Sequence, residues 1–587
     1  MIKKWILGEF IRDNLSKYTL GILALVVSSF LNLTIPKLLG YIIDLLKTPE
    51  VGQSRIFWLT FIMLAVSALL FVMKYTWRYF LMGRARDLEC FLRAKLFAHL
   101  QTLPVKFYNN KKTGDLMAYA INDLNAVRQA FSFGIVSIID GVIINLASLL
   151  VMVKTINPIL TAVAIGPIII AVVIIINMRK SIRERFIEVQ EAFASVSEKI
   201  QENISGIRVV KAYVQEKSEI RKMEKASQHR MDVQMKYVRL SAFLAPSVQL
   251  CFGISYTLVI IIGSSYVSRG VISLGDFIAF NTYLALLTGP ITNVGKIVEV
   301  WQKAMASIKR LDEIFLTKTD IVDDNPTYNE DKFKGDLRIQ NLNFIYPGTT
   351  RRALRDINIE LKAGKTLAII GKTGSGKTTL INLLLRLYKL EYGHIFIDGV
   401  DINDMPISVL RDNIGCVPQD NFLFSATIKE NIEFFKEGYT DDDVEEAAKM
   451  SSVYENIIDF PEGFETVVGE RGITLSGGQK QRISIARAII KDPSILILDD
   501  SLSAVDTKTE EEILTNIKEI LKGRTGIIIA HRISTLKHAD EIIVMDKGRI
   551  IEKGTHQSLL DVQGHYYKLY CAQLAETKLE NVEEIAI

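Results

Sequence analysis

A glycine-rich stretch in the second half of the chain has the spacing of a phosphate-binding loop. Within TLAIIGKTGSGKTTLINLLL, the pattern G-x-x-x-x-G-K-[ST] is matched by Gly371, Gly376, Lys377 and Thr378. When such a loop follows an apolar strand and precedes a helix, its backbone N–H groups and the N-terminal end of the helix dipole can bind an anion. Lys377 would reach the β- and γ-phosphates of ATP, and the Thr378 hydroxyl would bind Mg²⁺. The predicted nucleotide-binding residues are Gly371, Lys372, Thr373, Gly374, Ser375, Gly376, Lys377, Thr378 and Thr379.

Two adjacent carboxylates end an aliphatic run further along the chain. In ILILDDSLSAVD (residues 495–506), Asp499 and Asp500 follow four branched apolar residues, which predict a strand buried on both faces. Neighbouring carboxylates repel each other, so a fold keeps them together where a cation or a reaction needs them. Downstream of a phosphate loop, we expect Asp499 to hold Mg²⁺ directly or through water. The alternative is a helix N-cap before SLSAVD.

The composition argues against several other classes of protein. A net charge of +4 over 587 residues is too small to indicate a nucleic-acid-binding protein. The cysteines form no C-x-x-C pair, so no zinc site or disulfide framework is visible among Cys90, Cys251, Cys416 and Cys571. The hydrophobic fraction of 49% is high for a soluble protein, and the chain is too long for one ordinary core.

Long apolar segments are confined to the first part of the chain. Each is long enough to cross a bilayer as a helix, and no such run recurs after Gly335. The alternative, a large soluble protein, would need six over-long buried helices in succession. We predict a transmembrane domain over 1–316, a linker over 317–334, a nucleotide-binding domain over 335–575 and an acidic tail over 576–587. The predicted spans are 18–38, 56–78, 131–153, 155–178, 240–264 and 274–296.

Lysine and arginine are unevenly distributed between these spans. The N-terminal segment and the long connections 83–130 and 179–239 are rich in basic residues, whereas the short connections contain few. The positive-inside rule then places both termini, both long connections and the nucleotide-binding domain in the cytoplasm of a multi-pass protein of the cell membrane. The sequence RERFIEVQEAFASVSEKIQENISGIRVVKAY predicts a spanning helix that continues into water.

A third motif lies between the phosphate loop and the two aspartates. The residues LSGGQ, Leu475–Gln479, resemble the signature motif of the ABC (ATP-binding cassette) ATPases. In this motif Ser476, Gly477 and Gly478 open a helix, which can cap a phosphate. The resemblance extends to further motifs in the family's order and implies their roles. The resemblance implies that Tyr346 stacks on adenine and that Gln419 belongs to the Q-loop, which senses magnesium. It also implies that Ser503–Asp506 form the D-loop and that His531 is the switch histidine beside the γ-phosphate.

The resemblance covers nearly the whole chain. Thr466–Gly472 is similar to a loop typical of ABC exporters, and Phe107–Leu116 and Glu202–Lys217 resemble the exporters' intracellular loops, whose coupling helices touch the nucleotide domains. The implied fold is a six-helix transmembrane domain of the ABC exporter type, with long intracellular helices, followed by an α/β P-loop ATPase domain. Six spans and one cassette make half of an exporter. A second half-transporter is implied, because each signature closes over the nucleotide held by the other cassette.

One residue departs from the family's pattern. Most members place a glutamate directly after the position of Asp499, where it polarises the attacking water, whereas this chain has Asp500. The aspartate carboxylate is set back by one methylene, and a misplacement of that size can cost on the order of a hundredfold in rate. We expect this chain to bind ATP and Mg²⁺ and to hydrolyse ATP slowly, which resembles the degenerate-site subunit of heterodimeric bacterial multidrug exporters. Its intact LSGGQ would serve the partner's site.

The expected function is ATP-driven export of hydrophobic drug-like or lipid-like compounds through the bilayer, with no role for nucleic acid. Two alternatives stay open: a homodimeric lipid or peptide exporter that runs slowly on Asp500, and a membrane regulator or channel gated by ATP. Polar and aromatic residues within the spans are candidates for substrate contact, although pairing between helices explains them as well. These are Lys37, Asp140, Gln249, Phe252, Tyr256, Tyr283 and Lys296.

Overall fold

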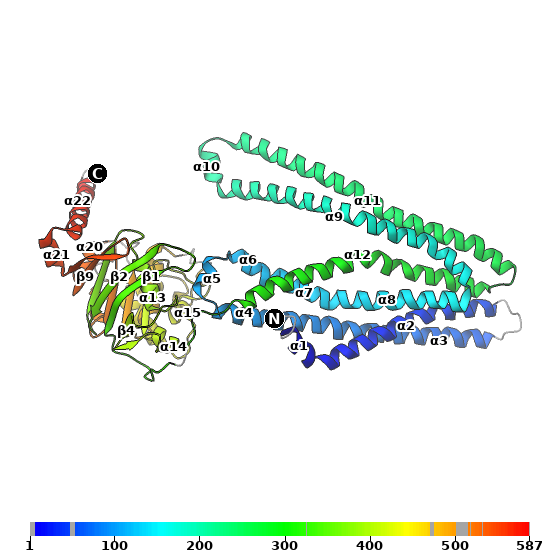
Figure 1. Ribbon diagram of the computed structural model, residues 1–587, viewed down its shortest axis with the longest axis horizontal. Coiled ribbons are helices and arrows are strands. Elements are labelled where there is room, and N and C mark those ends of the chain that lie inside the picture. Colours follow the sequence, from blue (N-terminus) through cyan, green and yellow to red (C-terminus); the bar gives the residue numbers. More distant parts are fainter. Residues whose placement is uncertain are drawn as a thin grey trace. The chain divides into compact units, whose positions relative to one another are not determined.

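The structure, a computed structural model, describes residues 6–46, 53–323, 326–469, 475–500, 513, 515–516, 518–530 and 532–585. The chain divides into two compact units (Figure 1). The first contains Met1–Gln101 and Lys112–Thr317, and the second contains Thr102–Lys111 and Lys318–Ile587. The first unit is helical, whereas the second is built around two β-sheets.

Long helices make up the first unit, and short π-helical turns join several of them end to end. The α-helices are α1 (Leu7–Asp13), α2 (Leu15–Leu46), α3 (Gln53–Trp77), α4 (Gly83–Thr102), α6 (Thr113–Ala118), α7 (Leu124–Gln129), α8 (Ile135–Val151), α9 (Pro158–Ser205), α10 (Ile207–Ala212), α11 (Glu216–Ser268) and α12 (Leu274–Leu316). The π-helical turns are η2 (Arg78–Met82), η3 (Tyr119–Asp123), η4 (Ala130–Gly134) and η5 (Met152–Ile156). The predicted second span is therefore part of one continuous helix that runs on through α4.

Five helices in the described part of the chain are long and apolar enough to cross a membrane. They are Leu15–Leu46, Ser54–Thr102, Thr113–Ile156, Pro158–Ser205 and Glu216–Ser268. The fourth begins later than the predicted residue 155, because the backbone of Asn157 is extended and its side chain accepts hydrogen bonds from Ile159 N and Leu160 N, both at 3.0 Å. The predicted sixth span lies in α12, which has 43 residues and is outside this set of five.

The segment predicted to continue from the membrane into water is a single long helix. Helix α9 extends to Ser205, α10 forms a turn, and α11 returns beside α9 (Figure 1). Ser255 Oγ of α11 donates a hydrogen bond to the Ala164 carbonyl oxygen of α9 at 2.7 Å, which ties the two helices together. The prediction that the helix continues past the span is therefore confirmed, with α9 and α11 as an antiparallel pair.

Two of the candidate substrate contacts pair one helix with another. The Tyr283 hydroxyl is buried and donates to the Leu33 carbonyl oxygen at 2.8 Å. Ser29 Oγ donates to Asp140 Oδ1 at 2.6 Å. Tyr283 and Asp140 therefore both take part in hydrogen bonds between helices.

Helices α2 and α12 cross at a pair of glycines. A Cβ at Gly275 would lie 1.9 Å from the Gly40 carbonyl oxygen, and one at Gly40 would lie 2.6 Å from the Gly275 carbonyl oxygen. Asp44 Oδ1 accepts a hydrogen bond from Gly275 N at 2.7 Å in the first turn of α12. Small residues permit such close backbone contacts between helices in membranes. The crossing therefore depends on glycine at both positions.

We predict that Gly275→Ala destabilises the protein by about 1–3 kcal/mol, because the added methyl group overlaps the Gly40 carbonyl and forces the helices apart. The matched control is Gly253→Ala in α11, where a Cβ meets no atom within 4 Å. Alanine otherwise favours a helix over glycine by about 1 kcal/mol, so the control should be neutral or stabilising. Thermal unfolding of the purified proteins in detergent measures the melting temperatures of both variants. Equal melting temperatures for the two variants would contradict the close crossing.

Two sheets form the framework of the second unit. One is antiparallel with the order β2-β1-β4-β5; the other has the order β10-β9-β3-β8-β7-β6, in which β9, β3, β8, β7 and β6 run parallel. The strands are β1 (Leu337–Ile345), β2 (Arg352–Leu361), β3 (Thr366–Gly371), β4 (Ile395–Ile397), β5 (Val400–Asp401), β6 (Ile414–Val417), β7 (Ile495–Asp499), β8 (Thr525–Ile529), β9 (Glu541–Asp546) and β10 (Arg549–Gly554). Every residue of β7 is buried, as predicted for this strand.

Apolar side chains fill both faces of the parallel sheet. Ile369 and Ile497 belong to one core, shared with the antiparallel sheet, whereas Ile370 and Leu498 belong to a second core on the opposite face.

The α-helices in the described part of this unit are α5 (Val105–Asn109), α13 (Lys377–Leu384), α14 (Ile407–Asp412), α15 (Ile428–Glu433), α16 (Asp441–Met450), α17 (Tyr454–Ile458), α18 (Gly477–Ile489), α20 (Ile533–Leu536), α21 (His556–Val562) and α22 (His565–Ile585). Strands alternate with helices along the chain, as in an α/β fold.

Two segments outside the predicted nucleotide-binding domain belong to the second unit. The buried Arg386 side chain donates to the Met405 carbonyl oxygen at 2.7 Å and to the Val322 carbonyl oxygen at 3.3 Å, which holds the predicted linker against this unit. Asn109 Nδ2, at the end of α5, donates to the Tyr388 hydroxyl at 3.0 Å. The part of the first predicted intracellular loop that lies in α5 is therefore held within the second unit.

Candidate functional site

The predicted phosphate loop joins the C-terminal end of β3 to the first turn of α13. Gly376, directly before α13, has φ +107°, and a Cβ there would lie 2.8 Å from Leu354 Cδ2 and 3.0 Å from the Ala353 carbonyl oxygen. Only glycine suits both this dihedral angle and this space. The loop thereby closes tightly around the start of α13, where backbone N–H groups have no partner within the helix.

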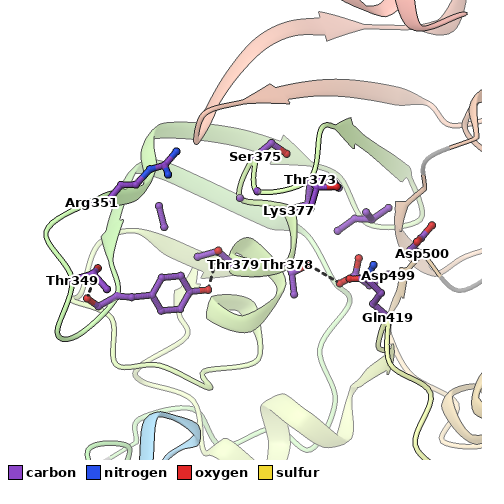
Figure 2. Close-up of a pocket in the computed structure, with 15 residues that line it drawn as sticks. Thr349, Arg351, Thr373, Ser375, Lys377, Thr378, Thr379, Gln419, Asp499 and Asp500 are labelled. Atoms are coloured by element: carbon purple, nitrogen blue, oxygen red, sulfur yellow. Dashed lines mark hydrogen bonds between the residues drawn. The ribbon is translucent and has the colours of Figure 1, made fainter. Parts of the chain in front are cut away.

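A cavity of about 390 Å³ lies at this loop (Figure 2). The predicted residues that line it are Tyr346, Thr373, Gly374, Ser375, Gly376, Lys377, Thr378, Thr379, Gln419, Asp499 and Asp500. Thr349, Arg351, Ala353 and Ile529 also line it and were not predicted. A signal for Thr349 and Arg351 was available, because the run TTRR begins three residues after Tyr346 and puts hydroxyl and cationic groups close to the predicted adenine contact in sequence. The fold thus assembles one pocket from segments far apart in sequence.

The Lys377 side chain folds over the phosphate loop. Its Nζ donates to the Gly371 carbonyl oxygen at 2.7 Å and to the Lys372 carbonyl oxygen at 3.2 Å, and the residue is 8% exposed. Burial lowers the pKa of this ammonium group, and the charges of Asp499 and Asp500 partly oppose that shift. The cation therefore lies at the pocket wall, where an anionic group would stabilise its charged form.

One buried polar atom of the loop has no hydrogen-bond partner in the structure. Ser375 is 2% exposed, and its Oγ has neither a donor nor an acceptor in the described part of the chain. A buried hydroxyl without a partner costs free energy unless another group satisfies it. A phosphate group at this position would provide acceptor oxygens, so the loop fits the phosphate part of a nucleoside triphosphate.

The two predicted metal-binding side chains meet at the edge of the parallel sheet. Thr378 Oγ1, at the start of α13, donates to Asp499 Oδ2 at 3.1 Å (Figure 2), and Asp499 is 4% exposed. Gln419, which follows β6, lies beside Asp499 in the same pocket. Hydroxyl, carboxylate and amide oxygens suit Mg²⁺, which takes few protein ligands and completes its shell with water and phosphate oxygens. The residues present therefore fit the cation.

The backbone of Asp500 is held in an unusual conformation. Its φ is +50°, in the left-handed region, and its N–H donates to the Ile529 carbonyl oxygen of β8 at 2.8 Å. Aspartate tolerates this region better than most residues that carry a side chain. The hydrogen bond to β8 fixes the starting point of the side chain, so the reach of the carboxylate is set by its own length.

Tyr346 is held at the mouth of the pocket by three contacts. Its hydroxyl donates to Thr379 Oγ1 at 2.9 Å, and its ring packs edge-on against Phe344 and Tyr388, each with ring centroids 5.1 Å away. Edge-to-face packing at this separation is favourable and fixes the orientation of the ring. The ring is therefore rigid, as a stacking surface for adenine would need to be.

The LSGGQ motif does not line this pocket. Ser476 caps α18: its Oγ accepts from Gln479 N at 3.3 Å, while Gln479 Oε1 accepts from Ser476 N at 2.9 Å. Ser476 and Gly477 are exposed at the start of this helix. The motif forms the predicted helix start, but the structure does not bring it to this chain's own phosphate loop.

Some predicted residues lie outside the described part of the chain. They are the switch histidine His531, the D-loop residues Ser503–Asp506, and the last three residues, Glu470–Gly472, of the loop Thr466–Gly472. Their roles stay predictions, as do the roles assigned above to individual residues of the pocket.

Comparison with known proteins gives the same two-part organisation. The model of the ABC transporter transmembrane region matches residues 18–291, and the ABC transporter ATPase model matches residues 354–503. The chain is 40% identical to the probable multidrug resistance ABC transporter ATP-binding/permease protein YheI of Bacillus subtilis (strain 168), over 96% of each chain. It is 34% identical to the ATP-dependent lipid A-core flippase of Syntrophus aciditrophicus (strain SB), over 83% of this chain and 81% of the relative. A solved bacterial Atm1-family ABC exporter with ATP bound has a TM-score of 0.74 at 25% identity, covering 96% of this chain and 99% of that one.

A phosphate loop, a buried aspartate at the neighbouring strand end and a helical membrane unit define a membrane ATPase. The chain belongs to the ABC transporter family, and its organisation is that of an exporter half with a transmembrane and an ATP-binding domain. It is a multi-pass membrane protein whose cytoplasmic ATPase domain couples ATP hydrolysis to transport.

We predict that Lys377→Ala weakens ATP binding to this chain by about tenfold to a hundredfold, because it removes a charged hydrogen-bond donor to phosphate. Tyr346→Ala should cost about 1 kcal/mol, roughly fivefold, because it removes one stacking surface. The matched control is Tyr392→Ala, an exposed tyrosine that does not line the nucleotide pocket. Photo-crosslinking of azido-ATP to this chain, titrated and quantified, measures the nucleotide affinity of the three variants. Undiminished labelling of the Lys377 and Tyr346 variants would contradict the placement of the site.

Proposed function

We propose that this chain is one half of an ATP-driven exporter of hydrophobic compounds, which holds ATP at its own phosphate loop, hydrolyses it slowly, and supplies its signature motif to a second half-transporter. The observation that carries the proposal is the aspartate at position 500, at the edge of an otherwise complete nucleotide pocket. Nucleotide binding and hydrolysis are therefore separable in this chain.

Nucleotide binding depends on groups that are all present. The loop Gly371–Thr379 would enclose the phosphates, with Lys377 neutralising the β- and γ-phosphates and Tyr346 stacking on adenine. Thr378, Asp499 and Gln419 would hold Mg²⁺, which neutralises charge on the phosphate oxygens when it is bound. The buried Ser375 hydroxyl without a partner supports an anion at the loop.

Hydrolysis depends on the reach of one carboxylate. The hydrogen bond from Asp500 N to the Ile529 carbonyl oxygen holds the backbone in place. Because aspartate is one methylene shorter than glutamate, its carboxylate then lies over an ångström behind the position that a glutamate carboxylate would reach. A shift of that size in a group that must orient water can reduce the rate on the order of a hundredfold. Backbone strain adds to this constraint, because the left-handed conformation limits how far residue 500 can move.

The signature motif supports the need for a second chain. Ser476, Gly477 and Gly478 open α18 at an exposed position away from this chain's own pocket. A helix start of this kind is suited to cap the γ-phosphate of a nucleotide held by another cassette. We favour a heterodimer, because a partner with a glutamate after its strand would provide the hydrolysis that this chain lacks; a homodimer is the alternative.

Exposed apolar surfaces at two places also support a partner. At the turn around α10, Val209 and Tyr213 are 61% and 73% exposed. In the second unit, Phe434 and Phe435 are each 53% exposed at the end of α15. Apolar side chains exposed to this degree in clusters are typical of surfaces that bind another protein. A second half-transporter is the partner that the proposed cycle requires.

The substrate class follows from the membrane unit and the relatives. Its spans are strongly apolar, and two curated relatives are named as a multidrug resistance transporter and a lipid A-core flippase. We propose drug-like or lipid-like hydrophobic compounds as the transported class. Substrate-stimulated ATP hydrolysis in vesicles, together with movement of the compound, distinguishes an exporter from a channel gated by ATP.

We predict that Asp500→Asn lowers turnover of the assembled pump only modestly, by less than about threefold, because this chain's site contributes little hydrolysis. Ser476→Arg should remove most turnover, because a bulky cation would occupy the place where the signature helix approaches the partner's γ-phosphate. Asp500→Glu should raise hydrolysis at this chain's site by extending the carboxylate toward the water.

ATP hydrolysis by purified complex at saturating ATP measures these three variants, and ATP binding to each checks that the complex is intact. Comparable, near-total losses from Asp500→Asn and Ser476→Arg would show that Asp500 is a working catalytic acid. The slow-site proposal would then fail, and the homodimer would be the better description.

A further inference from the structure

A second cavity lies at the opposite edge of the parallel sheet from the nucleotide pocket. Its volume is about 210 Å³, and its lining includes Thr366, the first residue of β3. The phosphate loop begins at Gly371, the last residue of the same strand. At about 3.3 Å per residue, the strand separates the two places by roughly 17 Å. Ile528, which lines the second cavity, and Ile529, which lines the first, are neighbours in β8 and face opposite sides of the sheet, and no described residue lines both cavities.

Positive charge is in excess around this cavity. Lys518 and Lys522 both line it. Lys522 Nζ is paired with Glu519 Oε2 at 2.6 Å, and the neighbouring Asp540 carboxylate is paired with Lys365 Nζ at 2.8 Å. Lys518 makes no ion pair with any carboxylate in the part of the chain that the structure describes. Among the described residues, no carboxylate therefore competes with a ligand for this charge.

A histidine adds to this cationic group. His538 lines the cavity, and the charged groups that act on it are Lys518, Lys537 and His556. Burial and these positive charges lower the pKa of the imidazole. A bound anion would offset the repulsion among the three cationic side chains and would favour protonated His538.

The rest of the lining is suited to hold an oxyanion. Leu521 and Ile528 are each 7% exposed and form apolar wall, which reduces the access of water and strengthens charge–charge interactions. Thr366 and Thr535 also line the cavity. Two lysines, a histidine that a bound anion would favour in its protonated form, and an apolar wall together match an anion that carries two charges and several acceptor oxygens.

We propose that this cavity binds a small phosphomonoester anion, with Lys518, Lys522 and His538 as its cationic ligands. A phosphomonoester supplies close to two negative charges near neutral pH and three acceptor oxygens. The volume corresponds to about seven water molecules at ~30 Å³ each, which accommodates a phosphate group and a short carbon chain. A free metabolite and a lipid headgroup share this chemistry.

Equilibrium dialysis tests the proposal on the complete, assembled protein in phosphatidylcholine nanodiscs. The nucleotide pockets are first saturated with a non-hydrolysable ATP analogue and Mg²⁺, and radiolabelled inorganic phosphate is the probe. We expect saturable binding that weakens about tenfold or more in Lys518→Gln and in His538→Gln, because each removes a charged donor. Lys518→Arg should retain binding. The matched control is Lys568→Gln, which removes the same charge at an exposed position on α22.

Each variant must bind the ATP analogue as the unmodified protein does, which shows that the ATPase domain is folded. An absence of saturable phosphate binding, or an equal loss in Lys568→Gln and Lys518→Gln, would overturn the proposal. Competition then identifies the source of the ligand. Displacement of the probe by glycerol 3-phosphate supports a free phosphomonoester, and displacement by vesicles of phosphatidic acid supports a lipid headgroup. Displacement by neither would overturn the phosphomonoester class.

Discussion

The hydrogen bond from the Thr378 hydroxyl to the Asp499 carboxylate joins two segments that are 121 residues apart. It forms because β3 and β7 flank β8 in one parallel sheet, with Asp499 paired to Ile529 at the C-terminal edge. Parallel strands present their carboxyl ends at the same edge, which is where α/β folds bind ligands. The strands are buried on both faces, so a slip in their register would disrupt two cores at once. The apolar packing of the ATPase domain thus keeps these two oxygen atoms together.

The same strand end determines what the site does once it is loaded. Asp499 continues the regular strand and faces Thr378, whereas Asp500 turns into a left-handed conformation that β8 holds by a hydrogen bond. The groups proposed to bind the nucleotide and Mg²⁺ come mainly from the phosphate loop and from β7, and their positions do not depend on the length of the side chain at residue 500. The orientation of water does depend on it. This geometry supports our proposal that the chain holds ATP and depends on a second cassette for fast hydrolysis.

Local patterns in the sequence predicted the parts of the site that short segments encode. The phosphate loop, the buried strand before Asp499 and the long apolar helices each depend on residues close together in the chain, so spacing and periodicity were sufficient. The helix start at Pro158 within the predicted fourth span follows from Asn157, which caps the helix through its side-chain hydrogen bonds. Arg351 was missed although the run TTRR lies close to Tyr346 in sequence, and the structure places it in the lining of the same pocket. Contacts such as Gly40 with Gly275 depend on helix packing, which no local pattern encodes.

The most direct test follows the γ-phosphate on each chain of the purified assembly. The complex is loaded with azido-ATP labelled either on the α- or on the γ-phosphate, allowed about one turnover, crosslinked by light and separated into its chains. If this chain binds ATP and hydrolyses it slowly, its ratio of γ- to α-label stays near the starting value while the ratio on the partner falls. A ratio that falls on this chain at the rate of overall turnover would show that Asp500 supports full hydrolysis, and would contradict the slow site.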